Sequence, residues 1–396
     1  MATSLQEAIL AHREAMIALT RDLIAIPSEN PPGDRYAECV DLLVRRLGEL
    51  GFTDTRVEGD CVVTFAGEGD RTLYFSGHYD VVPAQNRSQF EPMIHGANLF
   101  GRGSSDMKSG LAAMIYAAVA LRVSGALNGG RIGLVLVPDE ETAGPGGSRL
   151  LAERGLLGAN GIGMLTPEPT GGVIWNSNRG AITLKITTKG KAAHVGRQHE
   201  GVNAFERMLD VAQALRALKA EVEAANGSIL MLGGRSEGGT NFNAVPDACS
   251  FTVDRRINPG EDFDQEKRRL LDVLDRARDR GCELDLEILQ EGSASHASEN
   301  CALGQTLAAS IEIITGRAAR FEMCPGLLEI RFYNERGIPA FAYGPGLLTV
   351  SHGPNEFVPI QRMVECAQVY ALTAAELLAQ SEPAIGSGPA AVRGWR

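Results

Sequence analysis

The sequence has 396 residues, which is long for a single hydrophobic core and indicates two domains. Its 49 acidic and 38 basic residues give a net charge of −11, which argues against nucleic acid or an anionic membrane surface as a partner. The longest apolar run, 111–121, is too short to span a bilayer. Composition therefore indicates an ordinary globular protein rather than a disordered one.

Two further features predict a cytoplasmic protein. Residues 1–11 lack the basic start and the apolar core of an export signal. The seven cysteines are scattered singly, without the paired spacing of a disulfide framework, as is typical of reduced thiols.

The first part of the chain predicts an α/β domain. One opening helix is expected from Ser4, where Glu7 would complete a capping box, through Leu23. Short apolar runs at 62–65, 73–75 and 132–137 are typical of strands buried on both faces, and helices are expected at 107–123 and 146–153. This alternation of strands and helices indicates a mostly parallel central sheet.

The middle of the chain predicts a separate domain. Strands are expected at 182–187, 229–232, 249–253 and 284–288, with helical patterns at 205–215 and 270–277. Their order, βαββαβ, is that of a ferredoxin-like domain. The α/β character returns from Ala297, with a helix at 301–315, a strand at 340–343 and a closing helix near 362–378.

These patterns predict the domain boundaries. Residues 1–177 and 292–380 would form one α/β domain, and residues 178–291 a domain inserted into it. Residues 381–396 are rich in Gly, Pro and Ala and are expected to form a flexible tail.

Carboxylates and imidazoles follow the predicted strands. Each has an ordinary explanation by itself: a hydrogen-bonded pair, a helix N-cap or a solvated acidic turn. The carboxyl ends of parallel strands, however, line one crevice. The residues concerned are His78 and Asp80 after 73–75, Asp106 before a helix, Glu140 and Glu141 after 132–137, Glu168 after 162–165, and His352 past 340–343.

If these side chains lie together at one edge of the sheet, their ligand atoms are of the types that bind metal ions. Imidazole nitrogens and carboxylate oxygens are the ligands of two-zinc centres. His78 and Asp80 are two residues apart on an extended chain and face the same way, so Asp80 can orient a ligating His78. Of the adjacent Glu140 and Glu141, one can bind metal while the other transfers protons.

The order and spacing of these motifs resemble the metallopeptidase and deacylase family of aminoacylase-1, acetylornithine deacetylase, succinyl-diaminopimelate desuccinylase and carboxypeptidase G, from about Leu23 to Gln380. The resemblance implies a zinc-exopeptidase-like catalytic domain with an inserted lid and dimerisation domain. It implies two divalent ions, with zinc ahead of cobalt or manganese. The implied ligands are His78, Asp106 and Glu168 for one ion, and Asp106, Glu141 and His352 for the other.

The same resemblance implies three roles around the ions. Glu140 would be the general base, and Asp80 the partner that orients His78. A cis peptide bond would follow the bridging Asp106.

The resemblance also indicates residues that contact the substrate. His194, in segment 190–194, would reach the active site of the partner subunit. Asn243, in 241–246, would bind substrate, and Arg256, in 253–260, would clamp its carboxylate. Many family members carry Gly-Gly-Thr-Asp-x-Arg near the end of the catalytic domain. Here Glu329 and Arg331 fit that motif, and Arg331 is a third substrate-binding candidate, but bulkier apolar residues replace the glycine and threonine. We therefore do not expect the specificity of the best-known members to carry over.

We expect a homodimeric, metal-dependent amidohydrolase that cleaves the amide C–N bond of an N-acyl amino acid or short peptide with a free carboxylate. A dipeptidase or carboxypeptidase, and a hydrolytic deaminase or decarbamoylase, remain as alternatives. Outside this class, a metal- or ligand-binding protein without turnover is the alternative. Such a protein would have no reason to keep Glu140 free of metal.

Overall fold

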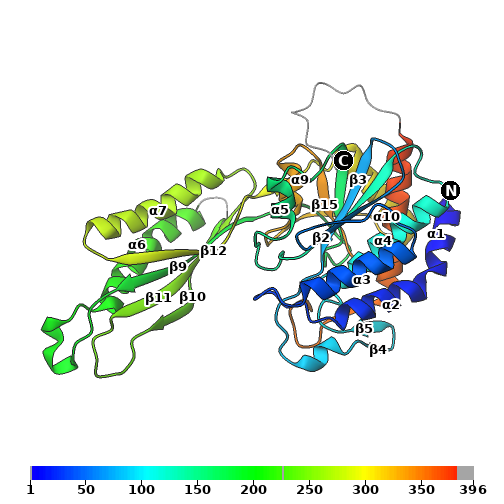
Figure 1. Ribbon diagram of the computed structural model, residues 1–396. Coiled ribbons are helices and arrows are strands. Elements are labelled where there is room, and N and C mark those ends of the chain that lie inside the picture. Colours follow the sequence, from blue (N-terminus) through cyan, green and yellow to red (C-terminus); the bar gives the residue numbers. More distant parts are fainter. Residues whose placement is uncertain (1, 225–226, 381–396) are drawn as a thin grey trace. The chain divides into compact units, whose positions relative to one another are not determined.

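The computed structural model describes residues 2–224 and 227–380 (Figure 1). The chain divides into two compact units. The first comprises the chain up to Ser177, His296–Cys324 and the chain from Glu329 onward, and the second comprises Asn178–Ser295 and Pro325–Leu328. The second unit begins where the inserted domain is predicted to begin. The tail predicted at 381–396 lies outside the described residues.

Within the described residues, the first unit contains a nine-stranded sheet with a parallel centre. The parallel strands lie side by side in the order β6 (Arg131–Val137), β3 (Thr72–His78), β7 (Gly161–Thr166) and β15 (Ala340–Ala342). Antiparallel pairing adds β2 (Cys61–Ala66) and β1 (Arg56–Glu58) beyond β6, and β8 (Ile174–Asn178) beside β15. The path continues to β13 (Ser295–His296), and β14 (Phe321–Cys324) pairs with β8. The ends of β3, β6 and β7 therefore open at one edge of the sheet.

Helices cover both faces of this sheet, as the apolar strands predict. Consecutive residues of β3 point to opposite faces. The ring of Tyr74 lies 5.7 Å from that of Tyr333 on α9 (Ile330–Asn334), whereas the ring of Phe75 lies 4.8 Å from that of Tyr370 on α10 (Ile360–Ala379). Strand β3 is consequently buried along its whole length.

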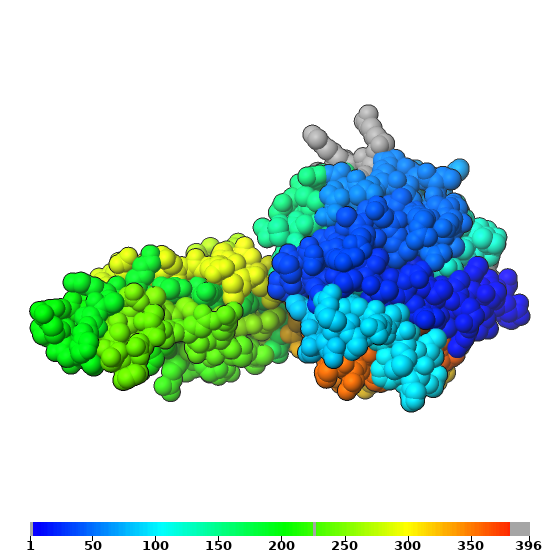
Figure 2. Space-filling view, turned by 60° about the horizontal axis from the view of Figure 1, so that its bottom comes forward, coloured from blue at the N-terminus to red at the C-terminus, as the bar shows by residue number. Residues whose placement is uncertain are grey.

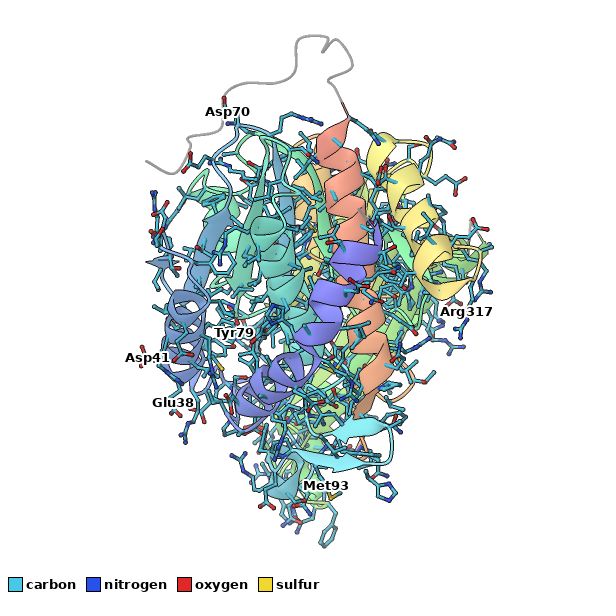
Figure 3. All side chains as sticks on the ribbon, turned by 90° about the vertical axis from the view of Figure 1, so that its right-hand side faces the viewer. Glu38, Asp41, Asp70, Tyr79, Met93 and Arg317 are labelled. Atoms are coloured by element: carbon cyan, nitrogen blue, oxygen red, sulfur yellow. The ribbon has the colours of Figure 1, made fainter. Side chains whose placement is uncertain are left out.

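Next to α10 lie α4 (Lys108–Val123) and α1 (Ala2–Ala11), and α2 (Arg13–Ile24) packs against α4 (Figure 3). The chain segment with α1, α2 and α3 (Tyr36–Glu49) is the blue surface in Figure 2. The single opening helix predicted from Ser4 is wrong. Ser4 lies inside α1, and His12, whose φ and ψ are −95° and 4°, separates α1 from α2 so that each can pack on α4. Helices α5 (Ser148–Glu153) and α8 (Ala302–Thr315) complete this unit.

A small sheet joins two distant parts of the first unit. Strand β5 (Asn98–Phe100) pairs with β4 (Met93–His95) on one side and with β16 (Phe357–Pro359) on the other, after the 3-10 turn η1 (Arg87–Phe90). This pairing holds the loop after β5, which leads to Asp106, beside the loop before β16, which carries His352.

The second unit has the predicted ferredoxin-like order. Its chain runs β9 (Gly180–Lys189), the 3-10 turn η2 (Val195–Glu200), α6 (Ala204–Ala224), β10 (Ile229–Gly238), β11 (Ala248–Ile257), α7 (Phe263–Asp279) and β12 (Leu284–Gly292). The antiparallel sheet has the order β10-β11-β9-β12. The apolar residues of β9 pack with Leu215 of α6 and Leu274 of α7 in the core. Across both units, none of the described helices has the length and apolar character needed to cross a membrane.

Candidate metal centre and active site

The five predicted ligands converge at the open edge of the parallel sheet. His78 ends β3, Glu141 lies just after β6, and Glu168 lies just after β7. Asp106 and His352 come from the two loops that the small sheet holds together. The side chains predicted to meet at the strand ends form two groups of potential ligands that share Asp106.

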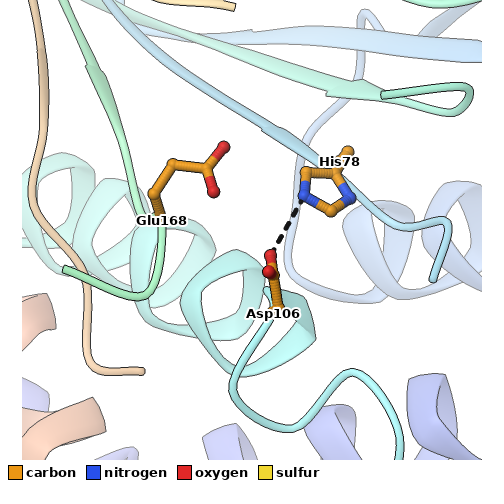
Figure 4. Close-up of side chains that lie close together, drawn as sticks. All are labelled: His78, Asp106 and Glu168. Atoms are coloured by element: carbon orange, nitrogen blue, oxygen red, sulfur yellow. Dashed lines mark ion pairs between the residues drawn. The ribbon is translucent and has the colours of Figure 1, made fainter. Parts of the chain in front are cut away.

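In the first group, ligand atoms of His78, Asp106 and Glu168 all lie within 4.8 Å of one another, and all three residues are buried. His78 Nε2 lies 3.3 Å from Asp106 Oδ1 (Figure 4). The second group consists of Asp106, Glu141 and His352. There His352 Nε2 lies 3.4 Å from Asp106 Oδ2 and 3.2 Å from Glu141 Oε2. Each oxygen of Asp106 thus faces a different histidine, and the Asp106–Met107 peptide bond is cis, as the resemblance implies.

The donors fit divalent metal ions. His78 Nε2 is buried and makes no hydrogen bond to any residue that the structure describes. Leaving a buried polar atom unpaired is costly, and a metal ion would satisfy this nitrogen. The carboxylates of Asp106, Glu141 and Glu168 repel one another in a buried site, and cations would offset that repulsion. Mixed imidazole and carboxylate ligands suit zinc and related divalent metals.

Asp80 lies behind His78 and contacts the segment that carries Glu140 and Glu141. Its side chain is fully buried, and its Oδ1 lies 3.4 Å from His78 Nδ1. Asp80 Oδ1 and Oδ2 accept hydrogen bonds from the backbone N–H groups of Glu140 and Glu141, at 3.3 and 3.2 Å. The side-chain amide of Asn30 donates to Asp80 Oδ2 at 2.9 Å. Sequence reasoning missed Asn30, because no local pattern links it to a residue 50 positions away.

Glu140 stands apart from both ligand groups while facing the site. Its Oε2 lies 3.7 Å from His78 Nε2, and its side chain is 14% exposed. Burial raises the pKa of Glu140 well above its usual range, and the carboxylates of Glu168 and Glu141 add to that rise. A carboxylate with a raised pKa accepts a proton readily.

Arg331 also belongs to the first unit, on α9. It is 4% exposed, and its guanidinium lies 4.1 Å from the ring centroid of Phe332. Burial lowers the pKa of Arg331, and the carboxylates of Glu329 and Glu140 oppose this shift. Arg331 therefore lies within electrostatic reach of Glu140.

The other predicted substrate residues belong to the second unit. The loops of His194 and Asn243 are paired, because Val195 N donates to Asn243 O at 2.9 Å. The exposed His194 accepts a hydrogen bond at Nδ1 from Gly196 N at 3.1 Å. Arg256 lies apart from them on β11, where its Nη2 donates to Asp254 Oδ2 at 2.8 Å and its Nε forms an ion pair with Asp254 Oδ1 at 2.8 Å.

Without metal ions, the protein is expected to lose stability as the pH rises from about 4.5 to about 10, most steeply between about 6.5 and 8, where Glu168 and His352 both contribute. Burial raises the pKa of Glu168 from 4.5 to about 8, and hydrogen bonds to Asp106 and Glu141 raise the pKa of His352 from 6.5 to about 10. Both groups hold protons more tightly in the folded chain than in the unfolded chain. The contribution of each group to folding stability is therefore complete below its pKa in the unfolded chain. It is lost as the pH rises through its pKa in the folded protein.

Melting temperatures of chelator-treated protein across this pH range test the expectation. Added Zn²⁺ should displace the protons and flatten the dependence. A melting temperature of the chelated protein that stays constant or rises with pH would contradict it.

The chain matches known proteins over almost its full length. Residues 74–376 match the model of peptidase family M20/M25/M40. A succinyl-diaminopimelate desuccinylase of Bordetella parapertussis is 28% identical over 382 residues, which cover 92% of this chain and 98% of that protein. Two solved structures have similar folds. The di-peptidase Dug1p of Saccharomyces cerevisiae has a TM-score of 0.79 at 15% identity and covers 96% of this chain and 99% of its own. A dinuclear metal-binding M20 peptidase of Bacillus subtilis has a TM-score of 0.67 at 17% identity and covers 93% and 99%.

The family model covers both the predicted metal-binding motifs and the inserted domain between them. The fold and the arrangement of ligands at the strand ends agree with that match. The chain therefore belongs to peptidase family M20/M25/M40.

Proposed function

We propose that this protein hydrolyses the amide bond of an N-acyl amino acid or a short peptide that carries a free carboxylate. Membership of the family indicates a metal-dependent hydrolase of C–N bonds. The observation that carries the proposal is the position of Glu140, which is buried beside His78 but lies outside both ligand groups. A protein that only stored metal would need no such proton acceptor.

We propose that the site holds two divalent ions, with zinc as the physiological metal. His78, Asp106 and Glu168 would hold one ion, and Asp106, Glu141 and His352 the other. When bound, the ions would polarise the scissile carbonyl and lower the pKa of the attacking water toward neutrality.

The chain's own residues would then move the proton. The Glu140 carboxylate would take a proton from the attacking water and deliver it to the nitrogen of the departing amine. Asp80 would hold the imidazole of His78 in one orientation and, through the backbone N–H of Glu140, keep the base in place.

The second unit would act as a lid and a dimerisation domain, with His194 reaching the active site of the partner subunit. We propose that His194 stabilises the oxyanion, that Asn243 binds the substrate and that Arg256, oriented by Asp254, holds its carboxylate. Arg331 would contact the substrate from the first unit. Leu327 and Leu328 stand where many family members carry glycine and threonine, so we leave the acyl group unassigned.

A substrate panel tests the proposal. Acetyl-, succinyl- and aryl-amino acids, dipeptides and carbamoyl amino acids would be incubated with protein loaded separately with zinc, cobalt or manganese. Hydrolysis of acylated amino acids or peptides supports the proposal. Turnover of carbamoyl compounds alone favours the decarbamoylase alternative. Tight metal binding with no turnover of any compound favours the non-catalytic alternative.

A further inference from the structure

A buried ion pair lies behind the second group of ligands. Arg102 follows β5, and Glu356 precedes β16. Their side chains are each 1% exposed, and Arg102 Nη1 donates to Glu356 Oε2. Replacing a buried ion pair by apolar residues is often neutral or stabilising, so stability alone does not account for this pair. The other hydrogen bonds of Arg102 and Glu356 connect the pair to the loops that carry Asp106 and His352.

Glu356 holds the loop that carries Asp106. Its second oxygen, Oε1, accepts hydrogen bonds from the backbone N–H groups of Ser105 at 2.9 Å and of Asp106 at 3.0 Å. Hydrogen bonds to an ionised carboxylate are shorter and stronger than neutral ones. The backbone of the shared ligand is therefore attached to a buried charge.

Arg102 holds the loop that carries His352. Its Nη2 donates to His352 O at 3.2 Å, and its Nη1 lies 3.4 Å from Gly353 O. The same His352 carbonyl accepts from Gln85 Nε2 at 2.8 Å, and Gln85 Oε1 accepts from Arg102 Nη2 at 2.9 Å. His352 has φ of +65°, in the left-handed region that non-glycine residues rarely adopt. Its backbone thus depends on surrounding hydrogen bonds.

We propose that the Arg102–Glu356 pair sets the distance between Asp106 and His352, and so the affinity of the ion held by Asp106, Glu141 and His352. Both are positioning residues, because they hold the backbone of two ligands and are not ligands themselves. The ion held by His78, Asp106 and Glu168 has no ligand on the His352 loop. The inference rests on the proposed pair of metal sites.

Arg102→Lys tests this proposal. Lysine keeps the positive charge beside Glu356 but lacks the planar fork that reaches two carbonyls at once. Losing a group that orients a ligand typically weakens metal binding by about 10–100-fold. We expect one of the two Zn²⁺ affinities, measured by chelator competition on the full chain, to fall by that factor while the other is unchanged.

Two further variants separate positioning from a general effect on folding. Arg255→Lys is the matched control, because Arg255 is 2% exposed and pairs with Glu261 and Glu266 in the second unit, which carries none of the predicted metal ligands. It should lower the melting temperature without changing either Zn²⁺ affinity. If Arg102→Lys does not fold, Gln85→Ala, at an exposed residue, should weaken the same Zn²⁺ site by a smaller factor.

The outcomes are distinguishable. Unchanged Zn²⁺ affinities in Arg102→Lys and Gln85→Ala, with only the melting temperature lowered, would overturn the positioning role. So would an equal loss at both sites. A wild-type protein that binds fewer than two Zn²⁺ ions would overturn the proposed two-metal site itself, and this inference with it.

Discussion

Replacing Glu140 by Gln is expected to reduce turnover by about 10²–10⁴-fold, the usual contribution of a general base. Glutamine keeps the size of the side chain but cannot take a proton from water. Because Glu140 lies outside both ligand groups, the variant should still bind two metal ions. Initial rates and metal content, measured on the same preparation, check both expectations.

Glu141→Gln is the matched control, since it makes the same substitution at the neighbouring residue. Glu141 Oε2 lies 3.2 Å from His352 Nε2 in the second ligand group. This variant should lose or weaken one metal ion, and its activity should fall together with metal content. A Glu140→Gln variant that keeps substantial activity with both ions bound would refute the assignment of the base.

Replacing His194 by Ala is expected to reduce turnover by about 10²–10³-fold, the cost of losing one oxyanion donor. His194 Nδ1 accepts a hydrogen bond from Gly196 N, so the proton of the neutral ring lies on Nε2. The exposed ring therefore presents a donor nitrogen. His199→Ala, at another exposed histidine in the turn that follows, is the matched control and should keep its activity.

Mixing two inactive variants tests whether His194 acts in the partner subunit. A heterodimer of His194→Ala and Glu140→Gln contains one site with an intact base and an intact histidine. Activity should recover after subunit exchange, approaching half of wild type per mixed dimer. No recovery in demonstrated heterodimers, or full activity from a strictly monomeric protein, would rule out a role in trans.

Most of the candidate metal site could be predicted from local sequence patterns. Apolar runs identify buried strands because burial on both faces removes polar residues from them. Polar residues directly after those strands must lie at the sheet edge, which placed His78, Glu141 and Glu168 correctly relative to one another. The ferredoxin-like order of the second unit followed from the same periodicity.

Features that depend on distant contacts were missed or wrong. The capping box at Ser4 failed because packing of α1 and α2 on α4 determined where the helices break. Strands β4, β5 and β16 have three residues each, which is too short for a recognisable alternation of apolar and polar residues. Asn30 is a single residue outside any local pattern. Arg102 and Glu356 lie in the loops of Asp106 and His352, yet their contact joins residues 254 positions apart.

The sequence by itself determined the α/β class, the order of elements in the second unit and the residue types gathered at one edge of the sheet, because these follow from hydrophobic periodicity along the chain. The shared position of Asp106 and the separate role of Glu140 were implied only by the family resemblance. The tertiary structure decided which oxygen of Asp106 faces each histidine, and that a buried ion pair holds the loops of Asp106 and His352. Those outcomes depend on side-chain directions and on contacts between remote segments. Packing selects them from many arrangements that the same local pattern allows.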